Sequence, residues 1–152
     1  MGGFSRSQMI YLDTSAVVPL IVHETTSSRA RIWRDSLDAG QLQRLAISEW
    51  TRTEFTSAIG SKVRNRDLTR REGEAALALL EQSVLPNVML VAVTVTDFRL
   101  AEIMLREVSL GLHAGDALHL ATASRCAVEL FVALDRTLAR AATALGIPVA
   151  RI

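Results

Sequence analysis

Short apolar runs alternate with longer segments of helical pattern along the chain, and this alternation limits the possible folds more than any other feature of the sequence. Each run is apolar on both faces, and the four runs cover residues 9–12, 45–47, 88–95 and 130–134. Strands of this kind are typical of a parallel sheet covered by helices on both sides. We therefore predict an α/β fold with three layers, α/β/α. Residues 147–152 would add an edge strand and bring the central parallel sheet to about five strands.

Helical patterns fill the segments between these runs. We predict helices over residues 16–22, 25–37, 49–59, 68–85, 98–108, 116–127 and 138–145. Thr14 or Ser15 would cap the first helix and Asp97 the fifth, because short polar side chains accept hydrogen bonds from the free N–H groups of a first turn. Ligands of such sheets bind beyond the carboxyl ends of the strands, so the residues that follow the strands are the candidates for function.

Composition narrows the class of protein further. A chain of 152 residues, 49% of them hydrophobic, predicts a single folded domain rather than a disordered chain. The one cysteine, Cys126, excludes an intramolecular disulfide and a cysteine-rich metal site. A net charge of +1 argues against binding to polyanions through bulk charge. No apolar run reaches the roughly 18 residues of a membrane span, and no secretory signal begins the chain. We expect a cytoplasmic protein with a flexible leader over residues 1–8 and one domain over residues 9–152.

Four carboxylates lie at or near the predicted strand ends. Asp13 and Asp135 come directly after the first and fourth runs. Asp116 follows Gly115 at the start of a helix, and Glu54 lies one to two turns into the helix after the second run. Taken one at a time, each is explained as a helix cap or a solvated helix residue. Taken together, four acids from four segments can converge at one edge of the sheet.

Convergence of these acids is unfavourable unless something compensates their charge. Two carboxylates about 4 Å apart repel by about 4 kcal/mol at an effective dielectric constant of roughly 20. Either some of the pKa values rise, or a cation lies among the acids. Oxygen ligands without a Cys or His cluster favour Mg²⁺ or Mn²⁺, and such ions promote the hydrolysis of phosphodiesters. The acids therefore predict metal-dependent cleavage of phosphodiester bonds.

Other polar residues allow two interpretations each. His119 lies one turn after the third acid, where it would serve as a proton donor or a partner of the acids, or simply pack as a helix histidine. Arg136 follows the fourth acid and would contact a substrate phosphate or pair with an acid. Arg64 and Arg66 belong to a basic turn that would position phosphates or merely face solvent.

Several segments carry a resemblance to a known family through their order and spacing, although no single one is decisive. They are Ile10-Tyr11-Leu12-Asp13-Thr14-Ser15-Ala16, Ser48 with Glu54 six residues later, Gly115-Asp116-Ala117-Leu118-His119-Leu120-Ala121-Thr122-Ala123, Ala133-Leu134-Asp135-Arg136-Thr137-Leu138 and Leu145-Gly146-Ile147-Pro148-Val149. In this order they resemble the PIN-domain ribonucleases of the VapC type, the toxins of type II toxin–antitoxin pairs. The resemblance covers nearly the whole chain from Met9 onward.

This resemblance implies a PIN-like domain with a set of residue roles. The catalytic and metal-binding acids would be Asp13, Glu54, Asp116 and Asp135. The supporting residues around them would be Ser15, Thr14 and His119, with Ser15 bonded near the first acid. The family also implies Mg²⁺- or Mn²⁺-dependent cleavage of structured RNA (tRNA or ribosomal RNA), a homodimer and a VapB-like antitoxin. One departure is Ala133, where the family often has Ser or Thr two residues before the fourth acid.

Three other functions remain open on the residues alone. A phosphatase would use Asp13 as its nucleophile, but Ser15 stands where such enzymes need a second Asp. A receiver-like signalling domain would need a Lys after a late strand, and the only lysine is Lys62. A PIN-like domain without activity would bind nucleic acid or protein, although all four acids are present.

Overall fold

The core of the molecule is a sheet of four parallel strands in the order β3-β2-β1-β4. The computed structural model describes residues 8–152, so residues 1–7 of the predicted leader lie outside the described residues. The strands are β1 (Ile10–Leu12), β2 (Leu45–Ser48), β3 (Met89–Val91) and β4 (Leu130–Val132). The predicted edge strand over residues 147–152 is reduced to one parallel bridge between Val149 and Phe131. Pro148 has no N–H to extend that ladder.

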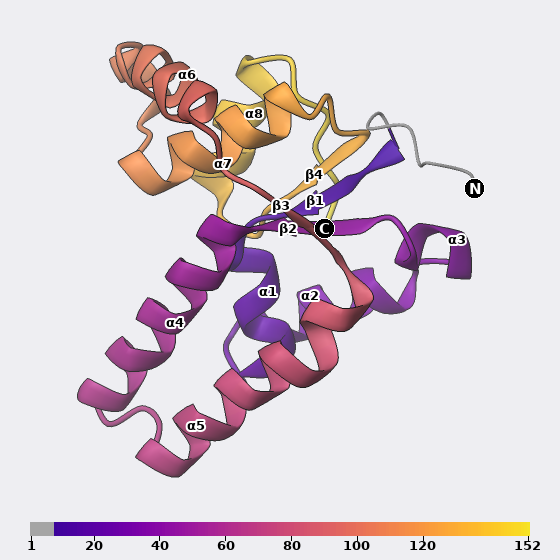
Figure 1. The fold of residues 1–152 in the computed structure, drawn as a ribbon, viewed down its shortest axis with the longest axis vertical. Coiled ribbons are helices and arrows are strands. Elements are labelled where there is room, and N and C mark those ends of the chain that lie inside the picture. Colours follow the sequence, from indigo (N-terminus) through magenta and orange to yellow (C-terminus); the bar gives the residue numbers. More distant parts are fainter. Residues whose placement is uncertain (1–7) are drawn as a thin grey trace.

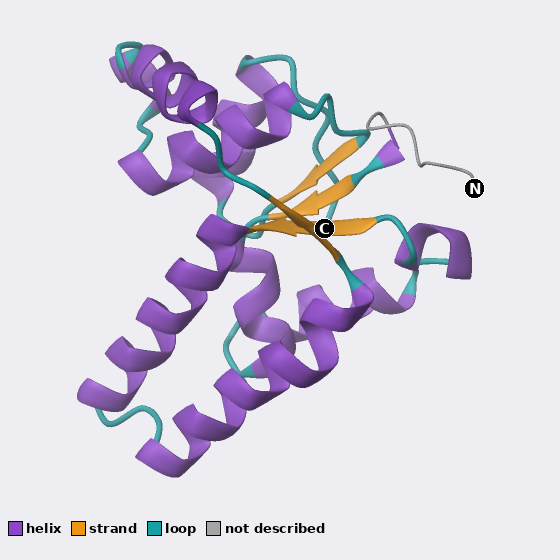
Figure 2. Ribbon diagram, viewed as in Figure 1, coloured by secondary structure: helices purple, strands orange, loops and turns teal. Residues whose placement is uncertain are grey.

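Helices cover both faces of the sheet, which confirms the predicted α/β/α layering (Figure 1). They are α1 (Thr14–Ile21), α2 (Ser27–Asp35), α3 (Ala39–Leu42), α4 (Glu49–Arg64), α5 (Arg70–Leu79), α6 (Val95–Leu105), α7 (Ala114–Arg125) and α8 (Arg136–Ala144). The described residues also include a short π-helix, η2 (Leu80–Val84), and two 3-10 helices, η3 (Leu85–Asn87) and η4 (Val108–Leu110). Figure 2 shows the strands between the two sets of helices, with α4 and α5 projecting as a hairpin.

Each face of the sheet has its own hydrophobic core. Alternate residues of β1 divide between them: Tyr11 packs with α6, α7 and α8, whereas Ile10 and Leu12 pack with α1, α4 and α5. Phe131 and Val132 of β4 divide in the same way. This division is the period of two that a strand buried on both faces requires. No helix within residues 8–152 combines the length and the apolar character needed to cross a membrane.

Several predicted element ends are wrong, and local capping explains the differences. The third strand ends at Val91 instead of 95, because Thr94 caps α6 and so starts that helix early. Asp97 is therefore not the cap; it is the third residue of the helix, and its carboxylate accepts a hydrogen bond from the Thr94 N–H at 2.9 Å. The helix α7 likewise starts two residues early, after His113. The short helix α3, capped by Asp38, was not predicted.

Candidate active site

Asp13 lies at the carboxyl end of β1, in the N-cap position of α1 that the sequence assigned to Thr14 or Ser15. Its side chain makes no capping hydrogen bond to the helix and is only 4% exposed. Ser15 Oγ donates to Asp13 Oδ1 at 2.7 Å, and no Lys or Arg within residues 8–152 forms an ion pair with this carboxylate. Burial raises the pKa of Asp13 to about 6, against the opposing effects of His119 and Ser15. Asp13 is thus a buried acid with no Lys or Arg partner in the described part of the chain.

Ser15 connects the first acid to the fourth. While its hydroxyl donates to Asp13, it accepts from the backbone N–H groups of Leu134 at 2.9 Å and Asp135 at 3.3 Å. The carboxylate of Asp135 caps α8, with Oδ1 accepting from Leu138 N at 2.8 Å. Because β1 and β4 are neighbours, the turns that follow them meet at this point. At the position of the family's Ser or Thr, Ala133 is buried and offers no hydroxyl.

Asp116 approaches the same site from the first turn of α7. It is half-buried, and its Oδ2 accepts from His113 N at 3.3 Å. Burial raises the pKa of Asp116, and the neighbouring carboxylates of Asp135 and Glu54 raise it further. The carboxylates of Glu54 on α4, Asp116 on α7 and Asp135 in the β4–α8 turn are thus near enough for their charges to interact.

Glu54, from the second turn of α4, is the most restrained of the four acids. Its Oε2 accepts from Thr14 Oγ1 at 2.5 Å and from His119 Nε2 at 2.7 Å. Burial alone would raise the pKa of Glu54, but the His119 and Thr14 hydrogen bonds lower it below its usual value. Trp50, one turn earlier in α4, lies against the same carboxylate and lowers this pKa as well.

Gly115 allows α7 to sit directly on this carboxylate. A Cβ at Gly115 would lie 2.5 Å from Glu54 Oε1 and 3.3 Å from Trp50 Nε1. No real Cβ occupies such a position, so any side chain here would displace Glu54 or the first turn of α7. The positive end of the α7 helix dipole is thereby brought against an anion.

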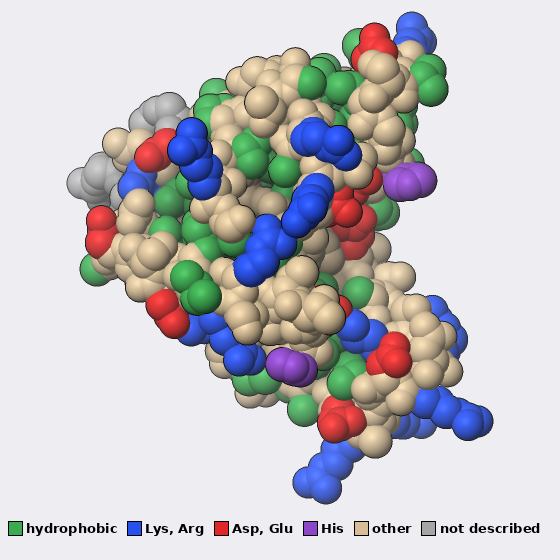
Figure 3. All heavy atoms as spheres, turned by 180° about the vertical axis from the view of Figure 1, so that it is seen from behind, with side chains coloured by type: hydrophobic (Ala, Val, Ile, Leu, Met, Phe, Trp, Pro, Cys, Tyr) green, Lys and Arg blue, Asp and Glu red, His purple; other side chains and the backbone are tan. Residues whose placement is uncertain are grey.

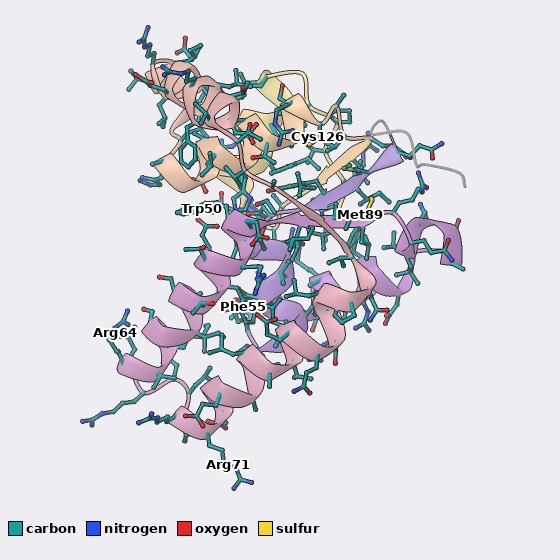
Figure 4. All side chains as sticks on the ribbon, viewed as in Figure 1. Trp50, Phe55, Arg64, Arg71, Met89 and Cys126 are labelled. Carbon is teal, nitrogen blue, oxygen red and sulfur yellow. The ribbon has the colours of Figure 1, made fainter. Side chains whose placement is uncertain are left out.

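The predicted basic residues fall in two separate places. Arg136 is exposed and begins α8, next to Asp135. Arg64 and Arg66 are exposed at the far end of α4, and Arg64 is about 15 Å along the helix from Glu54 at 1.5 Å per residue. Figure 4 shows Trp50 at one end of α4 and Arg64 at the other.

On the face of the molecule opposite to that of Figure 1, Asp and Glu side chains gather at one place, with Lys and Arg side chains beside them (Figure 3).

Two residues near the acids were missed from the sequence. The hydroxyl of Tyr11 lies 2.8 Å from His119 Nδ1, and Trp50 Nε1 is buried with no hydrogen-bond partner in the described part of the chain. A signal for Tyr11 was present: it is the only tyrosine, in a strand predicted to be buried on both faces. A buried phenol needs a polar partner.

The acids of the site are oxygen ligands, the kind that Mg²⁺ and Mn²⁺ prefer. Within residues 8–152, no three Asp, Glu, His or Cys side chains form a ready-made metal-binding group. The chemistry nevertheless fits a hard cation, because the facing groups are carboxylates and because Asp13 and Asp116 have raised pKa values. A cation among them would compensate their charge.

These features define a parallel α/β domain with an acidic site at the carboxyl ends of its strands, where such folds bind ligands. The family model described as PIN domain matches residues 10–144. The chain belongs to the PIN domain family. No curated protein sequence matches it significantly.

Several solved structures are similar to this fold. FitAcB from Neisseria gonorrhoeae superposes with a TM-score of 0.71 at 20% identity, covering 94% of this chain and 97% of the other. VapC20 from Mycobacterium tuberculosis, described as a Sarcin-Ricin loop cleaving toxin, has a TM-score of 0.70 at 21% identity, covering 94% and 99%. DNA-bound VapBC from Salmonella typhimurium has a TM-score of 0.65 at 16% identity, covering 94% and 97%. These likenesses confirm the fold.

Proposed function

We propose that this protein is a Mg²⁺- or Mn²⁺-dependent endoribonuclease, the toxin of a toxin–antitoxin pair. The observation that carries the proposal is the buried carboxylate of Asp13, which has no Lys or Arg partner within residues 8–152 and lies at a strand end of a PIN domain, near enough to Glu54 for the two charges to interact. A buried charge without compensation is unfavourable, and groups with strongly shifted pKa values concentrate at functional sites. The similarity to VapC20 supports RNA as the substrate.

Asp13, Asp116 and Asp135, with Glu54 behind them, are the residues that would hold the metal. When bound, the ion supplies positive charge that stabilises the developing charge on the phosphate. Ser15 fixes the spacing of the Asp13 and Asp135 turns, since one hydroxyl bonds to both. Thr14 and His119 hold Glu54 as an anion. Arg136, at the edge of the site, would contact a substrate phosphate, and Arg64 and Arg66 would contact a more distant one.

Partners follow from the same similarity. Two of the similar structures, VapBC and FitAB, are complexes that were solved bound to DNA. By analogy with the VapBC complex, we propose that this protein binds a VapB-like antitoxin. We also propose that it acts in the cytoplasm as a homodimer.

Cleavage of total tRNA and ribosomal RNA by the purified protein, in Mg²⁺, Mn²⁺ or EDTA, tests the proposal. We expect discrete fragments with either metal, none in EDTA, and none with Asp13→Asn, which removes the charge at nearly constant volume. Metal-independent cleavage, or full cleavage by Asp13→Asn, would contradict it. An absence of cleavage together with an absence of Mn²⁺ stabilisation would indicate a binding module instead, because a ligand that binds the folded state raises the melting temperature.

A further inference from the structure

A chain of hydrogen bonds, buried except at its last link, runs from the centre of the sheet to the Glu54 carboxylate. It begins at Ser48 on β2, passes through Tyr11 on β1 to His119 on α7, and ends at Glu54 on α4. The distances are 2.9 Å from Tyr11 Oη to Ser48 Oγ, 2.8 Å from Tyr11 Oη to His119 Nδ1, and 2.7 Å from His119 Nε2 to Glu54 Oε2. Tyr11 and His119 are 0% and 1% exposed.

The acceptor at the end of this chain determines what His119 does. An ionised carboxylate only accepts hydrogen bonds, so Nε2 of His119 carries a hydrogen and donates a hydrogen bond to Glu54. The other ring nitrogen is engaged by the Tyr11 hydroxyl. Both polar atoms of the ring are therefore in use, and a flip of the ring would break both contacts.

Packing removes the remaining freedom of the ring. Tyr11 meets His119 edge-on, with ring centroids 5.9 Å apart and planes at 68°. Tyr11 itself is stacked on Phe131, with centroids 5.7 Å apart. The imidazole is thus held by Tyr11, which belongs to a central strand of the sheet. Because the imidazole donates a hydrogen bond to Glu54, it restrains the position of that carboxylate.

Glu54 needs such a restraint because its other neighbours repel it. The carboxylates of Asp13 and Asp116 both interact unfavourably with it. Its side chain comes from a helix and is 28% exposed, so rotation toward solvent would relieve that repulsion. The hydrogen bonds from His119 and Thr14 oppose that movement.

We propose that Tyr11 and His119 are positioning residues that lock the Glu54 carboxylate against the other acids. The inference rests on the proposed nuclease function, and it goes further by assigning a task to two buried residues that do not reach the substrate. Hydrogen-bond partners of this kind change metal affinity or activity by about 10- to 100-fold when they are removed.

The test compares Tyr11→Phe, which removes only the hydroxyl, with His119→Met, which removes the N–H donor, and His119→Gln, which retains one. Thr122→Val is the matched control. Thr122 is buried in the same helix, and its hydroxyl donates to Leu118 O at 2.9 Å, away from Glu54. All four proteins are measured for the kcat and KM of RNA cleavage and, by calorimetry, for Mn²⁺ affinity.

We expect His119→Met to lower kcat or Mn²⁺ affinity by about 10- to 100-fold, with KM for RNA changed less than about threefold. Tyr11→Phe should lower the same quantities by about tenfold, and His119→Gln should recover part of the loss. Thr122→Val should match the wild type in all of them. Equal losses in Thr122→Val and His119→Met, or no loss in His119→Met, would overturn the inference.

A second measurement separates failure of this inference from failure of the nuclease proposal. Long-range ¹H–¹⁵N spectra of metal-free protein report both ring nitrogens of His119 and need no activity. We expect Glu54→Gln to change the Nε2 signal and Tyr11→Phe to change the Nδ1 signal. If the wild type neither cleaves RNA nor binds Mn²⁺, the nuclease proposal fails even where these signals change. Unchanged signals would overturn the lock itself.

Discussion

Two aspartates lie buried beside helix N-termini, and their surroundings differ sharply. Asp97 is 0% exposed in α6, and its carboxylate accepts from Arg125 Nε at 2.5 Å, from Arg125 Nη2 at 2.9 Å and from the Thr94 N–H. Burial opposes ionisation there, but these donors lower the pKa of Asp97. Asp13, equally buried, has a hydrogen bond from Ser15 and a pKa raised to about 6.

The difference separates an acid that stabilises the fold from the acid that we propose for catalysis. Arg125 also donates to Ala92 O, so its pair with Asp97 joins the end of α7 to the start of α6. The charge of Asp97 is compensated by Arg125, whereas Asp13 has no Lys or Arg partner among residues 8–152 and its pKa stays raised. Both carboxylates are buried and both lie at a helix N-terminus, so neither property alone identifies a site.

The largest expected effect is on stability, with opposite signs at the two positions. Asp97→Asn should lower the free energy of unfolding by about 3 kcal/mol, because it leaves the Arg125 charge without its partner. Asp13→Asn should raise it by about 1–3 kcal/mol in metal-free buffer at neutral pH, because an uncompensated buried charge is removed. Urea unfolding of both variants measures the two changes. A loss of stability in Asp13→Asn would contradict the comparison.

The pH dependence of stability sharpens the same contrast. The folded state favours protonated Asp13, whose pKa rises from an ordinary value of 3.8 to about 6. The stabilising effect is therefore complete below about pH 4 and is lost as the pH rises through about 6. About two pH units at about 1.4 kcal/mol each give a decrease on the order of 3 kcal/mol. Urea unfolding of metal-free wild type should show this decrease, and Asp13→Asn should show much less of it.

Substitution of two glycines tests whether the close approach of α7 to the Glu54 carboxylate matters for activity or only for packing. Gly115→Ala should lower RNA cleavage by about tenfold, because its Cβ would lie 2.5 Å from the Glu54 carboxylate. Gly73→Ala is the control, since its Cβ would lie 2.7 Å from Val63 Cγ2, in the α4–α5 hairpin. Overpacking there typically costs about 1–3 kcal/mol. Melting temperatures measure the loss of stability, and cleavage rates at a temperature where both variants are folded measure the loss of activity. Equal losses of activity in the two variants would contradict a specific role of Gly115 in the site.

The smallest expected effect is at the basic residues. Arg136→Ala should raise KM for RNA by about threefold, with a weaker salt dependence, because one phosphate contact is lost. Arg64→Ala, at the far end of α4, should change KM only for RNA long enough to reach it. Cleavage of short and long RNA at two salt concentrations distinguishes these cases. An unchanged KM for Arg136→Ala would assign that residue to the solvated surface.

Much of the fold was predictable because it depends on local pattern. The apolar runs placed all four strands, and parallel strands require their following residues to meet at one edge, which is why Asp13 and Asp135 were predicted as neighbours. Element ends were less predictable: Thr94 and Asp97 both have capping side chains, and only the backbone geometry decides which is the cap. The contrast between Asp13 and Asp97 was also beyond the sequence, because Arg125 is 28 residues from its partner.

The sequence by itself determined the layered α/β architecture and the set of candidate acids. The hydrophobic period and the alternation of strands and helices are both local patterns that can be read from neighbouring residues. The tertiary structure alone decided which acids are compensated and which are held. Contacts such as Tyr11 with His119, 108 residues apart, form only after helices and strands pack. They depend on distances and hydrogen-bond directions that no periodicity encodes, and these contacts distinguish a buried carboxylate that stabilises the fold from one that is available for chemistry.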